Sequence, residues 1–324
     1  MKLYAGVTDH DWFDYLRSLS ASPSEVLDEV NFWQPSPHAQ FQALSSGDLF
    51  LFKLHRSHLT HNQDLIAGGG VFASFSILPN SLAWEAFENR NGAASYAEMR
   101  ERLVHYRRIP DNPHEDFQVG CIILTQPFFF DESMWFPAPD WSAAIVRGKA
   151  KGYELDKEAG QFIWKNLHRA WERKRVFDLD REAQRVEEER ARYGKETTIT
   201  PRLGQGAFRV LVTDAYQRAC AITEEHSLPA LEASHIKPFN ENGPHSVNNG
   251  LLLRSDFHRL FDRGYITVTP EYRIEVSRRL KDEFENGRSY YPFHGRPLNH
   301  FPEAAQDRPL KELLIWHNEN AFRT

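Results

Sequence analysis

The stretch from residue 220 to residue 268, CAITEEHSLPALEASHIKPFNENGPHSVNNGLLLRSDFHRLFDRGYITV, changes its local pattern in a definite order. LEASHI is apolar with strand-like alternation, PFNENGPHSVNNG is dense in turn formers, and GLLL is a short apolar run. SDFHRLFDRG then has the pattern of a helix that is capped by Ser255 or Asp256 and closed by Gly264. The stretch therefore predicts a strand, a loop, a second strand and a helix in succession.

Polar side chains stand at the points where these elements would meet. His235 ends the first predicted strand, and His258 and Asp262 lie on the predicted helix. Because His258 and Asp262 are four residues apart, they share one helix face and can both reach a single cation. A histidine that faces a bound divalent ion can accept a proton from the water that attacks a phosphodiester. The ion then neutralises charge on the phosphate and the leaving oxygen.

The order of His235, Asn249 and His258 within these elements resembles the HNH nuclease family and its ββα-metal unit. The resemblance implies a catalytic set of these three residues, with His235 as general base and His258 as a metal ligand. It implies that Asn249 ties the long loop to the hairpin. Asp262 would be a second ligand, with Asp256 in reserve. The implied cofactor is a divalent metal, Mg²⁺ first, with Mn²⁺, Ni²⁺ or Zn²⁺ as alternatives.

Two positions depart from the family pattern. Many HNH units carry an Asp or His immediately before the base, where this chain has Ser234. The metal site is therefore expected to rely on the helix residues and water. Many relatives also hold a structural zinc through paired CxxC motifs, but Thr223 stands where the partner of Cys220 would be. No zinc ribbon is expected.

Length and composition limit the number of domains, the cellular compartment and the mode of nucleic-acid binding that the chain can have. With 324 residues it is too long for one ordinary core, so two domains are expected. The two cysteines, Cys121 and Cys220, fit a reducing compartment. No apolar run approaches bilayer length and no signal-peptide core is visible, which favours a cytoplasmic protein without membrane contact. The net charge of −6 argues against indiscriminate coating of nucleic acid.

Residues 2–153 mix predicted strands with short helices. Helices are expected at 9–19 and within 81–108, and strands near 31–33, 49–54, 71–78 and 117–130. The triplet Gly68, Gly69 and Gly70 has no following GK[ST], so it indicates a bulge or a close backbone approach and not a P-loop. The pattern predicts an α+β domain built on a small curved sheet or barrel.

The first domain also carries a resemblance. GDLFLFKL, the glycine-rich turn, AWEAF and GCIILTQPFFF, in this order, resemble the PUA-like superfamily and in particular EVE-type domains. The resemblance implies a pocket for a flipped, modified base, in which stacking contributes about 1–3 kcal/mol per base. The pocket candidates are Trp33, Trp84, Trp135 and Trp141. The alternative is that these rings pack in the core.

The composition shifts between residues 154 and 199. A helix with an apolar side leads into DLDREAQRVEEERARYGKE, which is almost all charged and lacks the seam of a coiled coil. We expect a helical linker at 154–199 between domains at 1–153 and 200–324. An amphipathic helix over 200–219 precedes the predicted hairpin. Side chains expected to contact DNA are Arg202, Gln205, Arg209 and Arg254.

These patterns predict a metal-dependent endonuclease acting on double-stranded DNA. The first domain would select DNA with modified cytosine, as in the modification-dependent restriction enzymes that the combination resembles and that act against phage. One alternative is a nucleic-acid reader without turnover, which Ser234 keeps open. Another is an HNH nuclease whose first domain binds a protein partner. With one such site per chain, cutting both strands would need a homodimer or sequential nicks.

Overall fold

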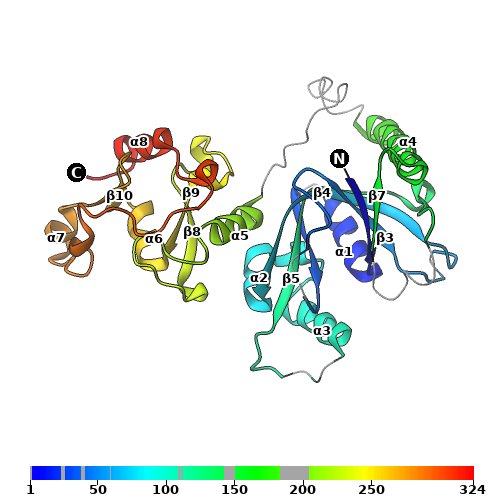
Figure 1. The fold of residues 1–324 in the computed structure, drawn as a ribbon, viewed down its shortest axis with the longest axis horizontal. Helices are drawn as coiled ribbons and strands as arrows, with labels where there is room; N and C mark the ends of the chain where they lie inside the picture. Colours follow the sequence, from blue (N-terminus) through cyan, green and yellow to red (C-terminus); the bar gives the residue numbers. More distant parts are fainter. Residues whose placement is uncertain are drawn as a thin grey trace. The chain divides into compact units, whose positions relative to one another are not determined.

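The structure is a computed structural model of the 324-residue chain. It describes residues 2–22, 26–37, 41–58, 60–108, 110, 112–141, 150–182 and 204–324. The chain divides into two compact units, Met1–Arg202 (unit 1) and Leu203–Thr324 (unit 2), whose elements are labelled in Figure 1. Hydrophobic clusters lie within each unit, so each unit is described by itself.

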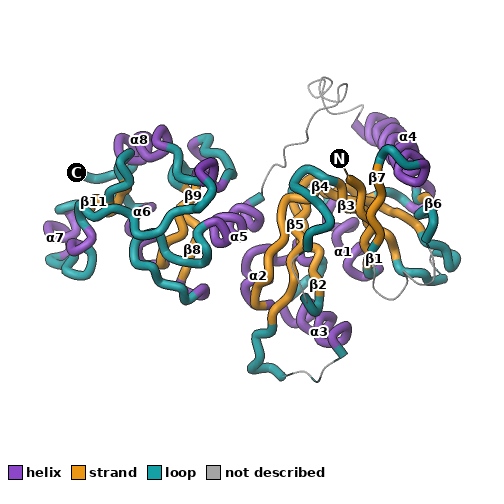
Figure 2. Tube along the Cα trace, viewed as in Figure 1, coloured by secondary structure: helices purple, strands orange, loops and turns teal. Residues whose placement is uncertain are grey.

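Unit 1 is built on one mixed sheet, drawn in orange in Figure 2. Its strands are β1 (Lys2–Thr8), β2 (Glu29–Gln34), β3 (Leu49–Leu54), β4 (Leu65–Pro79), β5 (Gln118–Phe129), β6 (Phe136–Pro137) and β7 (Lys151–Glu154). They pair in the order β2-β5-β4-β3-β1-β7, with β6 on β4. Because β1 and β3 run parallel, their C-terminal ends meet at the same edge of the sheet.

Helices cover both faces of this sheet. They are α1 (His10–Ser20), α2 (Asn80–Phe87), α3 (Tyr96–Arg107) and α4 (Glu158–Glu182). Side chains alternate along β3, so Phe52 and Leu51 point to opposite faces. Trp12 of α1 packs edge-on against Phe52, whereas Ile163 of α4 joins the core around Leu51. The strand is therefore buried on both sides, and its continuous apolar run reflects this.

The glycine triplet lies inside β4 and allows the backbones of three strands to approach one another. A Cβ on Gly68 would lie 2.3 Å from the Phe128 carbonyl oxygen, and one on Gly69 would lie 2.5 Å from the Phe50 carbonyl oxygen. The pairing of β4 with β5 also shifts register between Gly69 and Val71. The predicted bulge and close approach are confirmed.

The α+β class is confirmed, but the barrel is not. Among the described strands the pairings form an open path with β2 and β7 at its ends, so the sheet does not close on itself. Part of the predicted linker also belongs to unit 1, since Ile163, Leu167 and Ala170 of α4 lie in its core. The rest of the expected linker, from residue 183 onward, lies outside the described residues.

Unit 2 is centred on a hairpin with a helix on each side. Its elements are α5 (Gln205–Ala215), β8 (Leu231–His235), β9 (Gly250–Arg254), α6 (Ser255–Asp262), β10 (Ile266–Val268), β11 (Ile274–Val276), α7 (Arg279–Phe284) and α8 (Lys311–Asn320). The strand β11 is short and ends at Val276. Ser277 accepts a hydrogen bond from the Arg279 amide, and the backbone turns there into α7. No helix in the described ranges has the length and apolarity to cross a membrane.

Candidate active site

The hairpin β8–β9 separates its side chains onto two faces. The strands are antiparallel, with Ser234 opposite Leu251 and His235 opposite Gly250. Ser234 donates a hydrogen bond to Asp262 of α6 at 3.3 Å. The next residue, His235, faces the other way and stacks on Phe208 of α5, with ring centroids 3.7 Å apart. The end of β8 thus presents a hydroxyl to α6 and an imidazole to α5.

His258 lies between two carboxylates. Its Nδ1 is 2.5 Å from Glu232 Oε2 on β8, and its Nε2 is 3.1 Å from Asp262 Oδ2 one turn along α6. Burial acts to lower the pKa of His258, but the hydrogen bonds and charges of Asp262 and Glu232 outweigh it and raise the pKa above its ordinary value. The pair of carboxylates therefore favours positive charge at this point.

His235 is in the opposite electrostatic situation. Burial comes first, followed by the charge of His245, and together they lower the pKa of His235 to about 4. Asp262 acts in the other direction, and His258 lowers the pKa further. At neutral pH the ring of His235 is uncharged and able to accept a proton.

Asn249 holds the loop that connects β8 to β9. Its side chain is buried, accepts a hydrogen bond from the Lys237 amide at 2.9 Å, and donates to the carbonyls of Lys237 at 2.9 Å and Pro244 at 2.8 Å. Its backbone carbonyl accepts from the Ile236 amide. The loop therefore leaves His235 in a fixed direction.

Residues 220–269 match the HNH endonuclease family model. The match spans β8, β9 and α6, whose side chains are described above, and also β10. It supports a nuclease that acts on nucleic acid, and HNH nucleases generally depend on a divalent metal. No curated protein matches this chain at a significant level.

Two other candidates in the HNH unit pair with each other. Arg254 Nε and Nη2 hold the two carboxylate oxygens of Asp256 at 2.7 and 2.8 Å, and the Tyr290 hydroxyl adds a third contact. The hydrogen bonds from Arg254 outweigh burial and lower the pKa of Asp256. Asp256 is thus bound to Arg254 and not to the His258–Asp262 pair. Arg254 would have to give up this bidentate contact to hold a phosphate.

The remaining DNA-contact candidates lie at or before the start of α5. Gln205 is the first residue of the helix and is exposed, and Arg209 is half-buried one turn later. Arg202 lies outside the described residues. Gly204, which precedes the helix, is in an extended conformation. Gly206 and Ala207, which follow Gln205 in the helix, are buried.

The donor set of the HNH unit fits a metal ion only in part. Within the described chain, no three His, Cys, Asp or Glu side chains form a ready cluster for a metal. His258 Nε2 and Asp262 are nevertheless adjacent donors, and Glu232 on Nδ1 orients the ring as carboxylates commonly do for metal-bound histidines. Two donors fit a hard cation that keeps several waters, such as Mg²⁺, better than a zinc ion held by three or four side chains.

The four tryptophans proposed for a base pocket do not all share the same surroundings. Trp33 is 8% exposed and donates its Nε1–H to the Asn91 carbonyl at 2.9 Å. The other three are half-buried. Their nearest described ring or charge contacts are Tyr96 for Trp84, Phe13 for Trp135 and Lys53 for Trp141. Trp135 and Trp141 pack against the same apolar cluster, whereas the ring contacts of Trp33 and Trp84 are with Tyr106 and Tyr96.

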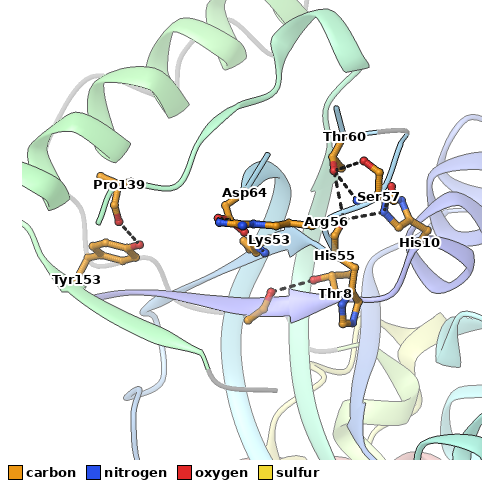
Figure 3. Close-up of polar contacts among 11 residues, drawn as sticks. Thr8, His10, Lys53, His55, Arg56, Ser57, Thr60, Asp64, Pro139 and Tyr153 are labelled. Carbon is orange, nitrogen blue, oxygen red and sulfur yellow. Dashed lines mark hydrogen bonds and ion pairs between the residues drawn. The ribbon is translucent and has the colours of Figure 1, made fainter. Parts of the chain in front are cut away.

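Trp141 contacts a buried ion cluster, which lies at the edge of the sheet where β1 and β3 end (Figure 3). Lys53 Nζ lies 2.6 Å from Asp64 Oδ1 and 4.9 Å over the Trp141 ring, and Arg56 also pairs with Asp64. The Lys53 side chain is only 2% exposed. Burial raises the pKa of Asp64, but Arg56 and Lys53 outweigh it and hold the pKa below its ordinary value. The charge of Asp64 is thus matched within the protein by two cations.

A serine–histidine contact beside this cluster does not have the geometry of a nucleophile and its base. His10 Nε2 lies 2.9 Å from the His55 carbonyl oxygen and 3.1 Å from Ser57 Oγ (Figure 3). A carbonyl oxygen only accepts, so Nε2 carries the hydrogen and cannot take one from Ser57. The contact holds the loop after β3 against α1.

Sequence reasoning missed two residues of the HNH unit, Glu232 and His245. Glu232 precedes Ser234 by two positions, so strand alternation places both on the face toward α6, and this signal was available in the sequence. His245 stands in the turn-dense loop, where no periodicity predicts a partner. Its Nδ1 lies 3.1 Å from His235 Nε2.

Proposed function

We propose that this chain is a metal-dependent endonuclease that hydrolyses phosphodiester bonds in double-stranded DNA. The observation that carries the proposal is a neutral imidazole, His235, whose pKa responds to the charges of a carboxylate-bound imidazole, His258, and of Asp262. His258 and Asp262 lie close enough to His235 for their charges to act on its pKa. A base and a cation-binding pair within that range are what hydrolysis of a phosphodiester requires.

In this proposal His235 takes the proton from the attacking water, since its pKa of about 4 keeps it neutral. His258 and Asp262 would hold the divalent cation, Mg²⁺ first and Mn²⁺, Ni²⁺ or Zn²⁺ as alternatives. When bound, the cation supplies neutralisation of charge on the phosphate and the leaving oxygen. Glu232 would keep His258 oriented through Nδ1, and Asn249 would hold the loop behind His235.

The test is cleavage of supercoiled plasmid by the full chain, with Mg²⁺, Mn²⁺ or EDTA. Wild type should cut only with a divalent metal, His258→Ala should lose most cutting, and Asp262→Ala should lose less, because water can replace one carboxylate. The exposed His226 offers a matched control, and His226→Ala should cut normally. Calorimetry should show weaker metal binding by His258→Ala, and unchanged affinity would remove its ligand role.

A non-catalytic nucleic-acid reader is the second candidate function, and the state of Ser234 favours it. Ser234 Oγ donates to Asp262 where many HNH units supply another ligand. Absence of nicking with every divalent metal, together with DNA binding, would support the reader. In a positive assay, nicked circles that appear before linear plasmid indicate sequential nicks, and linear product from the start indicates a homodimer.

We further propose that unit 1 selects DNA with modified cytosine, in defence against phage. A chain of net charge −6 binds plain DNA weakly through electrostatics alone, so selectivity needs specific contacts. The half-buried rings of Trp84, Trp135 and Trp141 can supply stacking surface. Digestion of matched phage DNAs carrying plain, methylated, hydroxymethylated or glucosylated cytosine tests this proposal.

Binding should be measured with the full chain carrying His235→Ala, because α4 belongs to the core of unit 1 and a fragment of residues 1–153 would lose it. Tighter binding to modified duplexes supports the reader domain. Equal binding to modified and plain duplexes would reject it and favour the alternative in which unit 1 binds a protein partner.

A further inference from the structure

The loop between β8 and β9 brings a second imidazole onto the proposed base. His245 Nδ1 lies 3.1 Å from His235 Nε2, and the two ring planes meet at 76°. The position of His245 is fixed, because Asn249 binds the carbonyl of Pro244, the preceding residue. The amide of Gly243 also bonds back to the Pro238 carbonyl and closes the loop.

Aromatic rings hold the two imidazoles from their outer sides. Phe208 stacks on His235 at 3.7 Å between centroids, and Phe239 stacks on His245 at 4.3 Å. Phe239 is 64% exposed, so His245 lies on the solvent side of the pair and His235 on the core side. The charged and titratable groups that act on His235 are His245, Asp262 and His258.

Two ring nitrogens at 3.1 Å share one hydrogen, so one imidazole donates and the other accepts. Within the described part of the chain, Nδ1 of His235 has no hydrogen-bond partner. If His235 donates from Nε2, its Nδ1 is an open acceptor. This tautomer leaves a place for the attacking water and an exit for its proton.

We propose that His235 and His245 form a proton relay, in which His245 receives the proton that hydrolysis delivers to His235. This inference rests on the proposed nuclease function and concerns the same site. The water O–H bond breaks as N–H forms at His235 Nδ1, and the hydrogen on His235 Nε2 moves to His245 Nδ1. His235 is then neutral as its Nδ1–H tautomer, and the positive charge resides on His245. Return of the hydrogen from His245 Nδ1 to His235 Nε2, with release of the proton on His235 Nδ1 to solvent, restores the starting pair.

Burial explains why a relay would help. It holds the pKa of His235 at about 4, so this ring is a poor resting place for a proton at neutral pH. The transfer moves the charge from the ring that stacks on buried Phe208 to the ring that stacks on exposed Phe239. His245 is thus a positioning and relay residue that acts through His235.

The discriminating variant is His245→Asn, because the amide oxygen can still accept from His235 Nε2 but cannot take up the proton. We expect an unchanged KM for plasmid DNA and a kcat lower by roughly 10-fold, a part of the 10²–10⁴-fold that a general base contributes. The acid limb of the kcat profile, which reports protonation of the pair, should move to lower pH. His226→Asn is the matched control.

A wild-type kcat in His245→Asn would overturn the relay. A lower kcat with an unmoved acid limb would overturn it as well, since orientation alone would then explain the loss.

A measurement that does not depend on catalysis separates this inference from the nuclease function. In ¹⁵N NMR of histidine-labelled protein, the relay requires a hydrogen on Nε2 of His235 and a bare Nδ1. Suppose that wild type shows this pattern, and His235→Ala a changed titration of His245, while wild type does not cut DNA. That result would reject the nuclease function and support the hydrogen-bonded histidine pair.

Discussion

Two polar clusters of this chain contain similar groups but differ in how far these groups are exposed. In unit 1, Lys53 and Asp64 are almost fully buried, and each charge is matched by a partner within reach. In unit 2, the side chains of His258 and Asp262 are 21% and 54% exposed, and His235 is held neutral beside another imidazole. The first cluster has its charges satisfied inside the fold. The second presents partly exposed side chains to an outside ligand, which is why function is assigned to it.

The largest effect is expected from a substitution of His235. His235→Ala removes the proposed base and should lower the cleavage rate by about 10²–10⁴-fold, or about 3–5 kcal/mol in activation free energy. DNA binding and folding should persist, since the ring lies at the end of β8 and is half-buried. Gel assays of plasmid cleavage measure the loss, with His226→Ala as control. Cutting at the wild-type rate would show that another group is the base.

At Lys53 the same kind of change should affect stability and leave the chemistry unchanged. Lys53→Met leaves the Asp64 carboxylate buried with Arg56 as its remaining cation, and breaking a buried pair costs about 3–5 kcal/mol of unfolding free energy. The two buried cysteines report each unit separately, Cys121 for unit 1 and Cys220 for unit 2. Thiol labelling in increasing urea should show earlier exposure of Cys121 alone.

Lys157→Met is the matched control for this change. Lys157 faces Asp156 at 3.9 Å, but both side chains are well exposed, and exposed pairs contribute about 0–1 kcal/mol. Equal labelling curves for the two variants would mean that the Lys53–Asp64 pair does not contribute to the stability of unit 1.

Much of the HNH unit can be predicted because its signal is local. Alternation in LEASH, turn formers in the loop and the helical pattern that ends at Gly264 each depend on neighbouring residues, and the structure has β8, β9 and α6 there. The predicted cap is wrong, because Arg254 is the N-cap of α6 and no side chain caps the helix. The partners are harder to predict. Glu232 reaches His258 across 26 positions, and His245 meets His235 only because the loop folds back.

Unit 1 shows the same limit on a larger scale. Its helices and strands β2 to β5 are found near their predicted ranges, whereas β1, β6 and β7 were not predicted. Sheet order and burial depend on distant pairings. Trp33 looks like a rim residue before a proline turn, yet the Asn91 carbonyl, 58 positions away, takes its Nε1–H in the core. Lys53 looks like the polar face of a strand, yet Asp64 and Trp141 enclose it.

A third prediction concerns pH and sharpens the contrast within unit 2. His317 is 3% exposed, stacks on Phe261, and has its pKa lowered to about 4 by burial, against which the Phe261 carbonyl and Asp262 act weakly. An unfolded histidine titrates near 6.5, so between pH 6.5 and 4 the unfolded chain binds a proton that the folded chain refuses. Unit 2 should lose stability as pH falls through this window, by up to about 3 kcal/mol.

Labelling of Cys220 with a dipyridyl disulfide, which reacts with thiols in acid, measures this loss as a function of urea and pH. His317→Gln should be less stable at pH 7, because its contacts with Thr267 and Phe261 change, but should have a flatter pH dependence. The same pH slope in both proteins would rule out His317 as its source.

The smallest predicted effect separates the core tryptophan from a half-exposed one in unit 1. Trp84 is half-buried beside Tyr96, with ring centroids 6.4 Å apart, so its ring can stack on a base without unfolding the domain. In the His235→Ala background, Trp84→Ala should reduce the preference for modified over plain duplexes by about 1–3 kcal/mol, the usual value of one stacked base. Trp33→Ala should instead destabilise unit 1 by about 3–5 kcal/mol, as loss of a buried aromatic ring does. Fluorescence anisotropy gives the first quantity and Cys121 labelling the second. A Trp84→Ala variant with the full preference, together with a stable Trp33→Ala variant that has lost it, would reverse the two assignments and place the base at Trp33.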